Sequence, residues 1–320
     1  MALTLKSQPI ETPSLHRFEV CADGLGRYTI DVSLPRGYEQ SDTAYPVVLT
    51  TDGNILFDIV QVQLHGGFAQ QQTALPPSIL VGVGYPADEG SASWYGRRNF
   101  DFHGPWDMSN PLGQTIHQIF GMLKGADGKP ELEIRAGGYT RFMAFLRDEL
   151  LPALAQRFRI APDGRHTLIG DSSGGHFALL ALYDPTSPFR RYVCVSPSLG
   201  TADGAIQEAE AAYAAQHTDL DADIFVCCGK VEVDQSPMMA MCRFGSGVTW
   251  LAEQFAIRQW PSARVHWEVM NNEDHATIAP RAISAGLRSV HRVRPGVHDE
   301  EIRQATEALM AARRAAQTTE

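Results

Sequence analysis

The sequence lacks the features that mark nucleic-acid-binding and membrane proteins. Its formal net charge is −10, and no cluster of Lys and Arg stands out. Because a phosphate backbone is bound through a basic face, this charge balance argues against DNA and RNA as partners. Residues 1–10 hold one Lys and no long apolar run, so the sequence predicts neither a secretory signal nor a membrane span. We therefore expect a cytoplasmic protein with no membrane partner.

Paired cysteines and internal repeats are also missing. The five cysteines form no CxxC pair and their number is odd, as expected of reduced thiols in a cytosolic protein. Cys194, Cys227 and Cys228 lie in apolar runs, where we expect core packing. No repeat, low-complexity tract or coiled-coil heptad is found, which argues against solenoids and fibrous proteins.

The composition that remains is that of an ordinary globular protein. Hydrophobic residues make up 44% and charged residues 20% of the 320 positions, which is enough apolar material for a substantial core. Folds built on one large sheet often reach this length as a single unit. We predict that residues 1–320 form one domain that carries insertions.

The first half of the chain predicts the edge and centre of a sheet. Residues 15–34 form two alternating segments joined at Asp23-Gly24, which indicates an antiparallel hairpin. Residues 45–51 and 78–84 are apolar without alternation, as is typical of strands covered on both faces in a parallel sheet. Residues 55–71 between them have helical spacing.

The second half predicts alternating strands and helices. Residues 166–170 form a short buried strand, 174–183 a helix and 192–196 another strand, which together make a βαβ unit. Further strands are expected at 223–228 and 265–270, and further helices at 139–158, 248–259, 278–290 and 299–315. The chain therefore belongs to the α/β class, with a mostly parallel central sheet and helices on both faces.

Two segments stand apart from this pattern. Between Ser91 and about Gly138 the periodicity fails, and we interpret residues 91–138 as a lid-like insertion whose aromatic residues, Trp94 and Trp106 among them, contact substrate. Packing over the sheet edge is an alternative role. Residues 298–320 are expected to form a C-terminal helix and tail that packs on its own domain or on a second subunit, so a homodimer is possible.

The pentapeptide Gly170-Asp171-Ser172-Ser173-Gly174 follows a predicted buried strand and opens a predicted helix. This G-x-S-x-G context is that of a nucleophile elbow, in which a strained turn presents a serine hydroxyl above the sheet edge of an α/β-hydrolase fold. The helix N-terminus also favours the oxyanion that forms when serine attacks a carbonyl. We predict Ser172 as the nucleophile.

A serine hydroxyl needs a base, and the base needs an orienting acid. In this fold both follow the serine, in loops after later strands. His275 comes just after the strand predicted at 265–270 and is our choice of base. The loop after 223–228 offers Glu232 and Asp234, and Glu232, which comes sooner after Gly229, is preferred.

The oxyanion hole requires two backbone N–H groups. Ser173 supplies the first, since it follows the nucleophile, and Asn54 or, behind it, Gly53 supplies the second from the turn after residues 45–51. The triplet His65-Gly66-Gly67 is similar to a lipase oxyanion motif, but it lies beyond the helix, and we interpret it as a helix end.

Several segments together resemble the Putative esterase family, which includes enterobactin and salmochelin esterases, S-formylglutathione hydrolase, feruloyl esterases and mycolyltransferases. These segments are Thr51-Asp52-Gly53-Asn54, Arg97-Arg98-Asn99-Phe100-Asp101, residues 142–152, the Gly170–Gly175 elbow, Ser196-Pro197-Ser198 and Gly229-Lys230-Val231-Glu232. The last of them matches the G-x-x-E of the siderophore-esterase branch. The resemblance covers about residues 15–290 and implies the same Ser, acid and His roles, with Glu232 as the acid.

One position departs from that branch and bears on substrate choice. Asp171 stands where the branch usually has His, and it adds negative charge beside the nucleophile. His176 is expected to border the pocket or to cap packing. Arg98, or its neighbour Arg97, is a candidate partner for a substrate carboxylate, with a structural ion pair to Asp101 as the alternative.

We therefore expect a serine carboxylic-ester hydrolase that acts through an acyl-enzyme on a small-molecule substrate, a bulky or aromatic ester or lactone. The reaction needs no cofactor and no metal. Acyl transfer or amide hydrolysis on the same triad, and a non-catalytic ligand-binding protein of this fold, are the alternatives.

Overall fold

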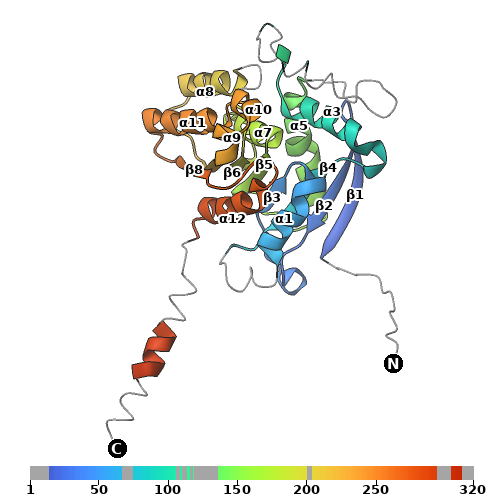
Figure 1. Cartoon of the computed structure of the whole chain (residues 1–320). Helices are drawn as coiled ribbons and strands as arrows, with labels where there is room; N and C mark the ends of the chain where they lie inside the picture. The colour runs from blue at the N-terminus through green and yellow to red at the C-terminus, as the bar shows by residue number, and fades with distance from the viewer. Residues whose placement is uncertain are drawn as a thin grey trace, which may run out of the picture.

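The structure is a computed structural model that describes residues 14–66, 75–105, 109, 114–115, 118, 136–199, 204–293 and 304–311. Its centre is an eight-stranded sheet with the spatial order β1-β2-β4-β3-β5-β6-β7-β8 (Figure 1). In chain order the strands are β1 (Leu15–Ala22), β2 (Gly26–Ser33), β3 (Val47–Thr50), β4 (Ile79–Gly84), β5 (His166–Asp171), β6 (Phe189–Val195), β7 (Asp223–Gly229) and β8 (Arg264–Met270).

The sheet is antiparallel at one edge and parallel elsewhere. β2 pairs in antiparallel fashion with both β1 and β4, whereas every pair from β4 through β3, β5, β6 and β7 to β8 is parallel. The predicted hairpin is confirmed, and Gly24 takes the left-handed conformation (φ 73°) in its turn. The alternating residues of β1 are half exposed, but β3, β4 and β7 are buried at every position, as their continuous apolar runs predict.

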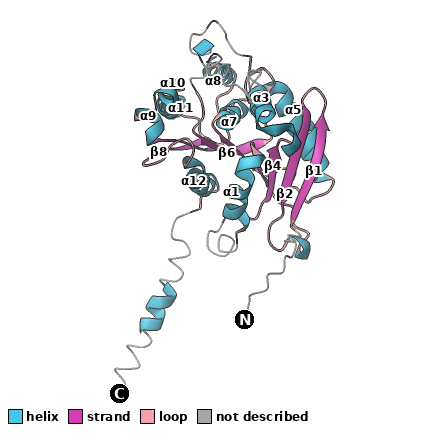
Figure 2. Cartoon of the chain, turned by 45° about the vertical axis from the view of Figure 1, so that its right-hand side comes forward, coloured by secondary structure: helices cyan, strands magenta, loops and turns pink. Residues whose placement is uncertain are grey.

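Two layers of helices cover the sheet (Figure 2). One face carries α1 (Gly53–His65) and α12 (Ile278–Val290), which pack with Val48, Ile169 and Phe225 in one apolar cluster. The opposite face carries α3 (Gly90–Phe102), α5 (Tyr139–Ala144), a π-helical segment (Phe145–Leu150), α6 (Leu151–Ala155), α7 (Ser173–Leu182), α8 (Ala205–Gln216) and α11 (Phe244–Arg258). The short helices α9 (Lys230–Asp234) and α10 (Pro237–Met241) connect β7 to α11.

The helix predicted over 139–158 contains a π-helical segment just before Pro152. Proline has no N–H to donate to the preceding turn, and a wider turn accommodates the missing bond. The buried side chains Phe142, Phe145 and Leu146 still face the core, as their spacing predicts.

The predicted insertion begins as an ordered helix. Residues 90–102 form α3, although their apolar periodicity is weak, because several of the inward-facing residues are polar. Asn99 and Asp101 are buried, while Phe102 packs its ring 5.6 Å from that of Phe142. Trp106 and most of residues 106–135 lie outside the described residues, so the lid role stays a prediction.

The remaining differences are at helices. α8 was not predicted, because this alanine-rich segment buries only Ile206 and Glu210 and has no apolar stripe. At the C-terminus, residues 304–311 are helical with exposed side chains, Leu309 and Met310 among them. The predicted homodimer is not tested by this single chain. As predicted, Cys194, Cys227 and Cys228 are buried.

Candidate active site

Ser172 occupies a strained turn between β5 and α7. Its backbone has φ 57° and ψ −116°, a combination that L-residues rarely adopt. The turn is so tight that a Cβ atom at Gly170 would overlap the carbonyl of Gly174, and one at Gly174 would overlap the Thr51 hydroxyl. Glycine is therefore required at both positions, and the serine side chain is lifted above the sheet edge.

The loops after β7 and β8 bring an acid and an imidazole to this serine. His275 Nε2 lies 3.0 Å from Ser172 Oγ, and His275 Nδ1 lies 2.5 Å from Glu232 Oε1. All three predicted residues thus meet in one hydrogen-bonded chain. Asp234 is exposed and pairs with Lys230 in the same short helix, so it does not reach the imidazole.

Glu232 is held from two further sides. Its Oε2 accepts hydrogen bonds from the Ser196 hydroxyl (2.8 Å) and from the Gly229 backbone N–H (2.5 Å). The side chain is 1% exposed. A buried carboxylate needs such donors to remain ionised. Ser196 directly follows β6. The sequence indicated only its family resemblance. Its contact with Glu232 was not predicted, because the two residues meet only when β6 and β7 pair.

The imidazole of His275 is half-buried, and its surroundings favour the protonated form. Burial lowers the pKa of His275, but the hydrogen bond to Glu232 and the charges of Asp171 and Glu232 outweigh burial and raise it above its usual value. The ring also lies 5.0 Å from the ring of Phe244 at the start of α11, a contact that the sequence did not predict.

Two helix N-termini face the same edge of the sheet as Ser172. Ser173 is the first residue of α7, and Gly53 and Asn54 are the first two of α1. Because the first N–H groups of a helix have no intrahelical acceptor, both ends offer donors. The Asn54 side chain also bonds to the N–H and carbonyl of Tyr85, at 2.7 Å each, which fixes the start of α1 against the end of β4.

His65 and Gly66 lie at the opposite end of α1 from Gly53 and Asn54, and Gly67 of the triplet lies outside the described residues. His65 is the last residue of α1, and Gly66 follows it as the C-cap. The imidazole bonds to Ser33 and to the carbonyl of Ser78. The interpretation as a helix end is confirmed.

Arg98 is engaged within the protein. Its Nε and Nη2 donate to the two carboxylate oxygens of Asp52 at 2.9 and 2.8 Å, and Nη2 also donates to the Asp171 carbonyl. The expected alternative partner, Asp101, instead accepts hydrogen bonds from the hydroxyls of Tyr28 and Tyr85. Arg98 therefore forms a structural ion pair, but with a partner 46 positions away in sequence.

The other residues predicted to bind substrate differ in accessibility. Asp171 directly precedes Ser172 and is partly buried. His176 is 1% exposed; its Nδ1 lies 2.8 Å from the Ser198 carbonyl, and its ring lies 4.4 Å from that of His103. Trp94 is half-buried and packs beside Tyr95 and Arg98. His176 thus lies beneath the site rather than on its surface.

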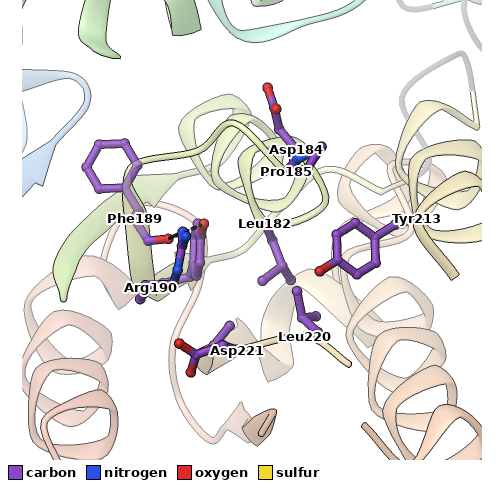
Figure 3. A pocket seen from close by; sticks show the side chains of 10 residues that line it. Leu182, Asp184, Pro185, Phe189, Arg190, Tyr213, Leu220 and Asp221 are labelled. Carbon is purple, nitrogen blue, oxygen red and sulfur yellow. Dashed lines mark hydrogen bonds between the residues drawn. The ribbon is translucent and has the colours of Figure 1, made fainter. Parts of the chain in front are cut away.

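The hollows that the structure describes lie at the opposite edge of the sheet, where β5, β6 and β7 begin. One, of about 110 Å³, is lined by Arg190, Tyr213 and Asp221 among others (Figure 3). A wider groove of about 710 Å³ continues past Arg190 to His166. Neither includes a residue of the Ser172 site.

Among the described residues, no group of three or more His, Cys, Asp or Glu side chains is placed to bind a metal ion. None of the described helices combines the length and hydrophobicity needed to cross a membrane.

Known proteins with related sequences and folds are esterases. The model of the family described as "Putative esterase" matches residues 130–289, which is half of the chain and includes all three residues of the hydrogen-bonded chain. The siderophore enterobactin esterase of Emericella nidulans is 29% identical over 197 residues, which cover 60% of this chain and 60% of that protein. The ferri-bacillibactin esterase BesA of Bacillus subtilis is 24% identical over 250 residues, which cover 76% of this chain and 78% of BesA.

Solved structures give the same fold. The siderophore hydrolase EstA of Aspergillus nidulans superposes with a TM-score of 0.73 at 20% identity, covering 91% of this chain and 99% of EstA. The BES protein of Bacillus cereus superposes with a TM-score of 0.69 at 24% identity. With half of its length matched by the family model and its sheet shared with these enzymes, the chain belongs to the Putative esterase family of the α/β-hydrolase fold.

Proposed function

We propose that the protein is a serine esterase that hydrolyses a carboxylic ester through an acyl-enzyme. The observation that carries the proposal is the continuous hydrogen-bonded chain from Ser172 through His275 to Glu232. A serine hydroxyl alone is a poor nucleophile, and this arrangement supplies a base at Oγ and a carboxylate at the far nitrogen of that base.

In the first half-reaction, His275 Nε2 takes the Ser172 proton as Oγ attacks the ester carbonyl. The oxyanion is stabilised by N–H groups at the starts of α7 and α1, from Ser173 and from Asn54 or Gly53. When the tetrahedral intermediate collapses, His275 returns the proton to the leaving alcohol, and the acyl group stays on Ser172. Glu232 holds the tautomer and stabilises the imidazolium.

In the second half-reaction, water attacks the acyl-enzyme carbonyl while His275 takes a proton from it. Collapse of this second intermediate releases the carboxylic acid and returns the proton to Ser172 Oγ. Every atom and proton is accounted for by the ester, one water and the three side chains. Transfer to another alcohol would require that alcohol to replace the water.

For the substrate we infer a siderophore ester or lactone. Three relatives act on such compounds, as their names state: the enterobactin esterase, BesA and the triacetylfusarinine C esterase of Aspergillus fumigatus. These molecules are bulky, in agreement with the predicted preference for bulky esters. A cytoplasmic location and a homodimer stay predictions.

A fluorophosphonate probe tests the proposal directly, because it reacts only with an activated serine. We expect labelling of the wild type and none of Ser172→Ala. Ser262→Ala, a change at an exposed serine before β8, is the matched control and should label like the wild type. Equal labelling of Ser172→Ala, or no labelling of a folded wild type, would favour a non-catalytic ligand-binding protein.

A further inference from the structure

Asp171 carries a carboxyl group that the proposed mechanism does not use. It ends β5, in register with Val195 of β6, which in turn pairs with Cys227 of β7. Since Val195 and Cys227 belong to the apolar layer under α1 and α12, Asp171 extends that layer to the edge of the sheet, directly before the nucleophile. Its Oδ1 is buried and has no hydrogen-bond partner in the part of the chain that the structure describes.

Charged groups from four other elements act on this carboxyl. Burial is the largest influence, and the pKa of Asp171 is raised to about 7. The charges of His275 after β8 and Arg98 on α3 lower this pKa. The charges of Asp52 before α1 and Glu232 on α9 raise it further. Asp171 therefore lies within electrostatic reach of the whole triad. Its ionisation changes the charge of the ester site near neutral pH.

The nearby guanidinium of Arg98 does not neutralise the charge of Asp171. Arg98 is 9% exposed and gives its Nε and Nη2 donors to Asp52, so that pair is close to neutral as a unit. Lys230 and Arg281 on the neighbouring segments are paired with Asp234 and Glu268. Arg243, which precedes Phe244 beside His275, is exposed, so that solvent and salt screen its charge. Among the described residues, the surplus buried charge around Ser172 is thus that of Asp171 and Glu232, and it is negative.

We propose that Asp171 is a specificity-determining residue that makes the ester site select uncharged and cationic esters over anionic ones. The inference rests on the proposed esterase function and narrows the siderophore esters inferred there to those that carry no net negative charge. The reaction already builds an oxyanion above Ser172. A second negative charge on the substrate would be repelled by Asp171 and Glu232, and because these carboxylate groups are buried, the Coulomb energies are larger than in water. A substrate ammonium group would gain from the same field.

The test compares three p-nitrophenyl esters that share one leaving group: the hemisuccinate, the butyrate and the 4-(trimethylammonio)butyrate. At pH 8 we expect kcat/KM for the butyrate to exceed that for the hemisuccinate by about tenfold or more, as one uncompensated charge at this range predicts. Asp171→Asn keeps the shape and removes the charge, and it should reduce this ratio about fivefold. Both esters react through the same Ser172 and His275, so the ratio of their kcat/KM values cancels any effect of the substitution on these two residues.

Asp163→Asn is the matched control, since it removes one carboxylate from the exposed opposite edge of the sheet and should leave the ratio unchanged. A second measurement needs no variant: the wild-type ratio should rise between pH 6 and pH 8 as Asp171 ionises. The inference is overturned if turnover depends on Ser172 but the ratio neither changes with pH nor responds to Asp171→Asn. Full turnover of the butyrate by Ser172→Ala would overturn the esterase proposal instead.

Discussion

The two edges of the parallel sheet have opposite characters. At the edge where the strands end, Ser172 is held at a strained φ, and Asp171 has a buried oxygen with no hydrogen-bond partner in the described part of the chain. At the edge where they begin, Arg165 pairs with Asp221 and Asp223, and Arg292 pairs with Asp223. What sets the Ser172 edge apart is the hydrogen-bonded chain of Ser172, His275 and Glu232. Strain or an unpaired polar atom alone does not, because at the opposite edge Arg292 also has a positive φ and Arg165 Nε also has no partner among the described residues.

The largest difference between the edges should be in catalysis. His275→Ala removes the base, and we expect kcat for a p-nitrophenyl ester to fall at least about a thousandfold. Arg190→Ala, between the two hollows of the opposite edge, should leave kcat within about twofold, because among the described residues Arg190 donates hydrogen bonds to the carbonyls of Ser187 and Phe189 and to no residue of the Ser172 site. Steady-state kinetics on both variants checks this. A large loss in Arg190→Ala would show that the two edges are functionally coupled.

The next difference should be in stability. Arg98→Met leaves the buried Asp52 carboxylate without its partner, and we expect the free energy of unfolding to fall by about 3–5 kcal/mol. Arg165→Met breaks a more exposed pair at the opposite edge and should cost only about 1 kcal/mol. Urea unfolding of the two variants measures both values. Equal losses would mean that the Arg98–Asp52 pair contributes no more to the free energy of unfolding than the exposed Arg165–Asp221 pair.

The charge of the triad edge should also appear in the pH dependence of activity. His275 acts as a base only when neutral, and its pKa is raised by Glu232 and Asp171, so kcat/KM should fall as the pH drops through a value above 6.5. Asp171→Asn removes one of the raising charges, so the acid limb of the profile should move to lower pH. Asp163→Asn should leave the limb in place. A limb that moves equally in both variants would indicate a general effect of net charge.

The smallest expected effect is a shift in thermal stability with pH. The folded-state pKa of Asp171 is raised from 3.8 to about 7, so ionisation destabilises the fold progressively as the pH rises from about 4 to about 7. Asn cannot ionise, so Tm of Asp171→Asn minus Tm of the wild type should increase by a few degrees between pH 5 and pH 8. Differential scanning fluorimetry at both pH values checks the sign. A difference independent of pH would place the Asp171 pKa near its ordinary value.

The sequence predicted those parts of the fold and site that short segments encode. The strands leading to Ser172 and Glu232 are short buried runs, and β8 before His275 is a more exposed edge strand. Each predicted residue lies within about five positions of the end of its strand, so local pattern and chain order were sufficient. Contacts made across strands were not predictable in this way. Ser196 reaches Glu232 through the pairing of β6 with β7. Arg98 pairs with Asp52, while the Asp101 carboxylate accepts hydrogen bonds from two distant tyrosine hydroxyls.

The proposed acid, Glu232, also stabilises local structure. Glu232 binds the N–H of Gly229 at the start of its own five-residue helix, so the carboxylate that orients the imidazole is also the cap of α9. A helix this short has little stability of its own. Glu232→Ala should therefore increase amide hydrogen exchange in residues 229–235 as well as reduce turnover, which makes exchange in this segment a reporter of whether the acid is in place. A substitution that removes the Glu232 carboxylate therefore affects both the activity and the stability of α9.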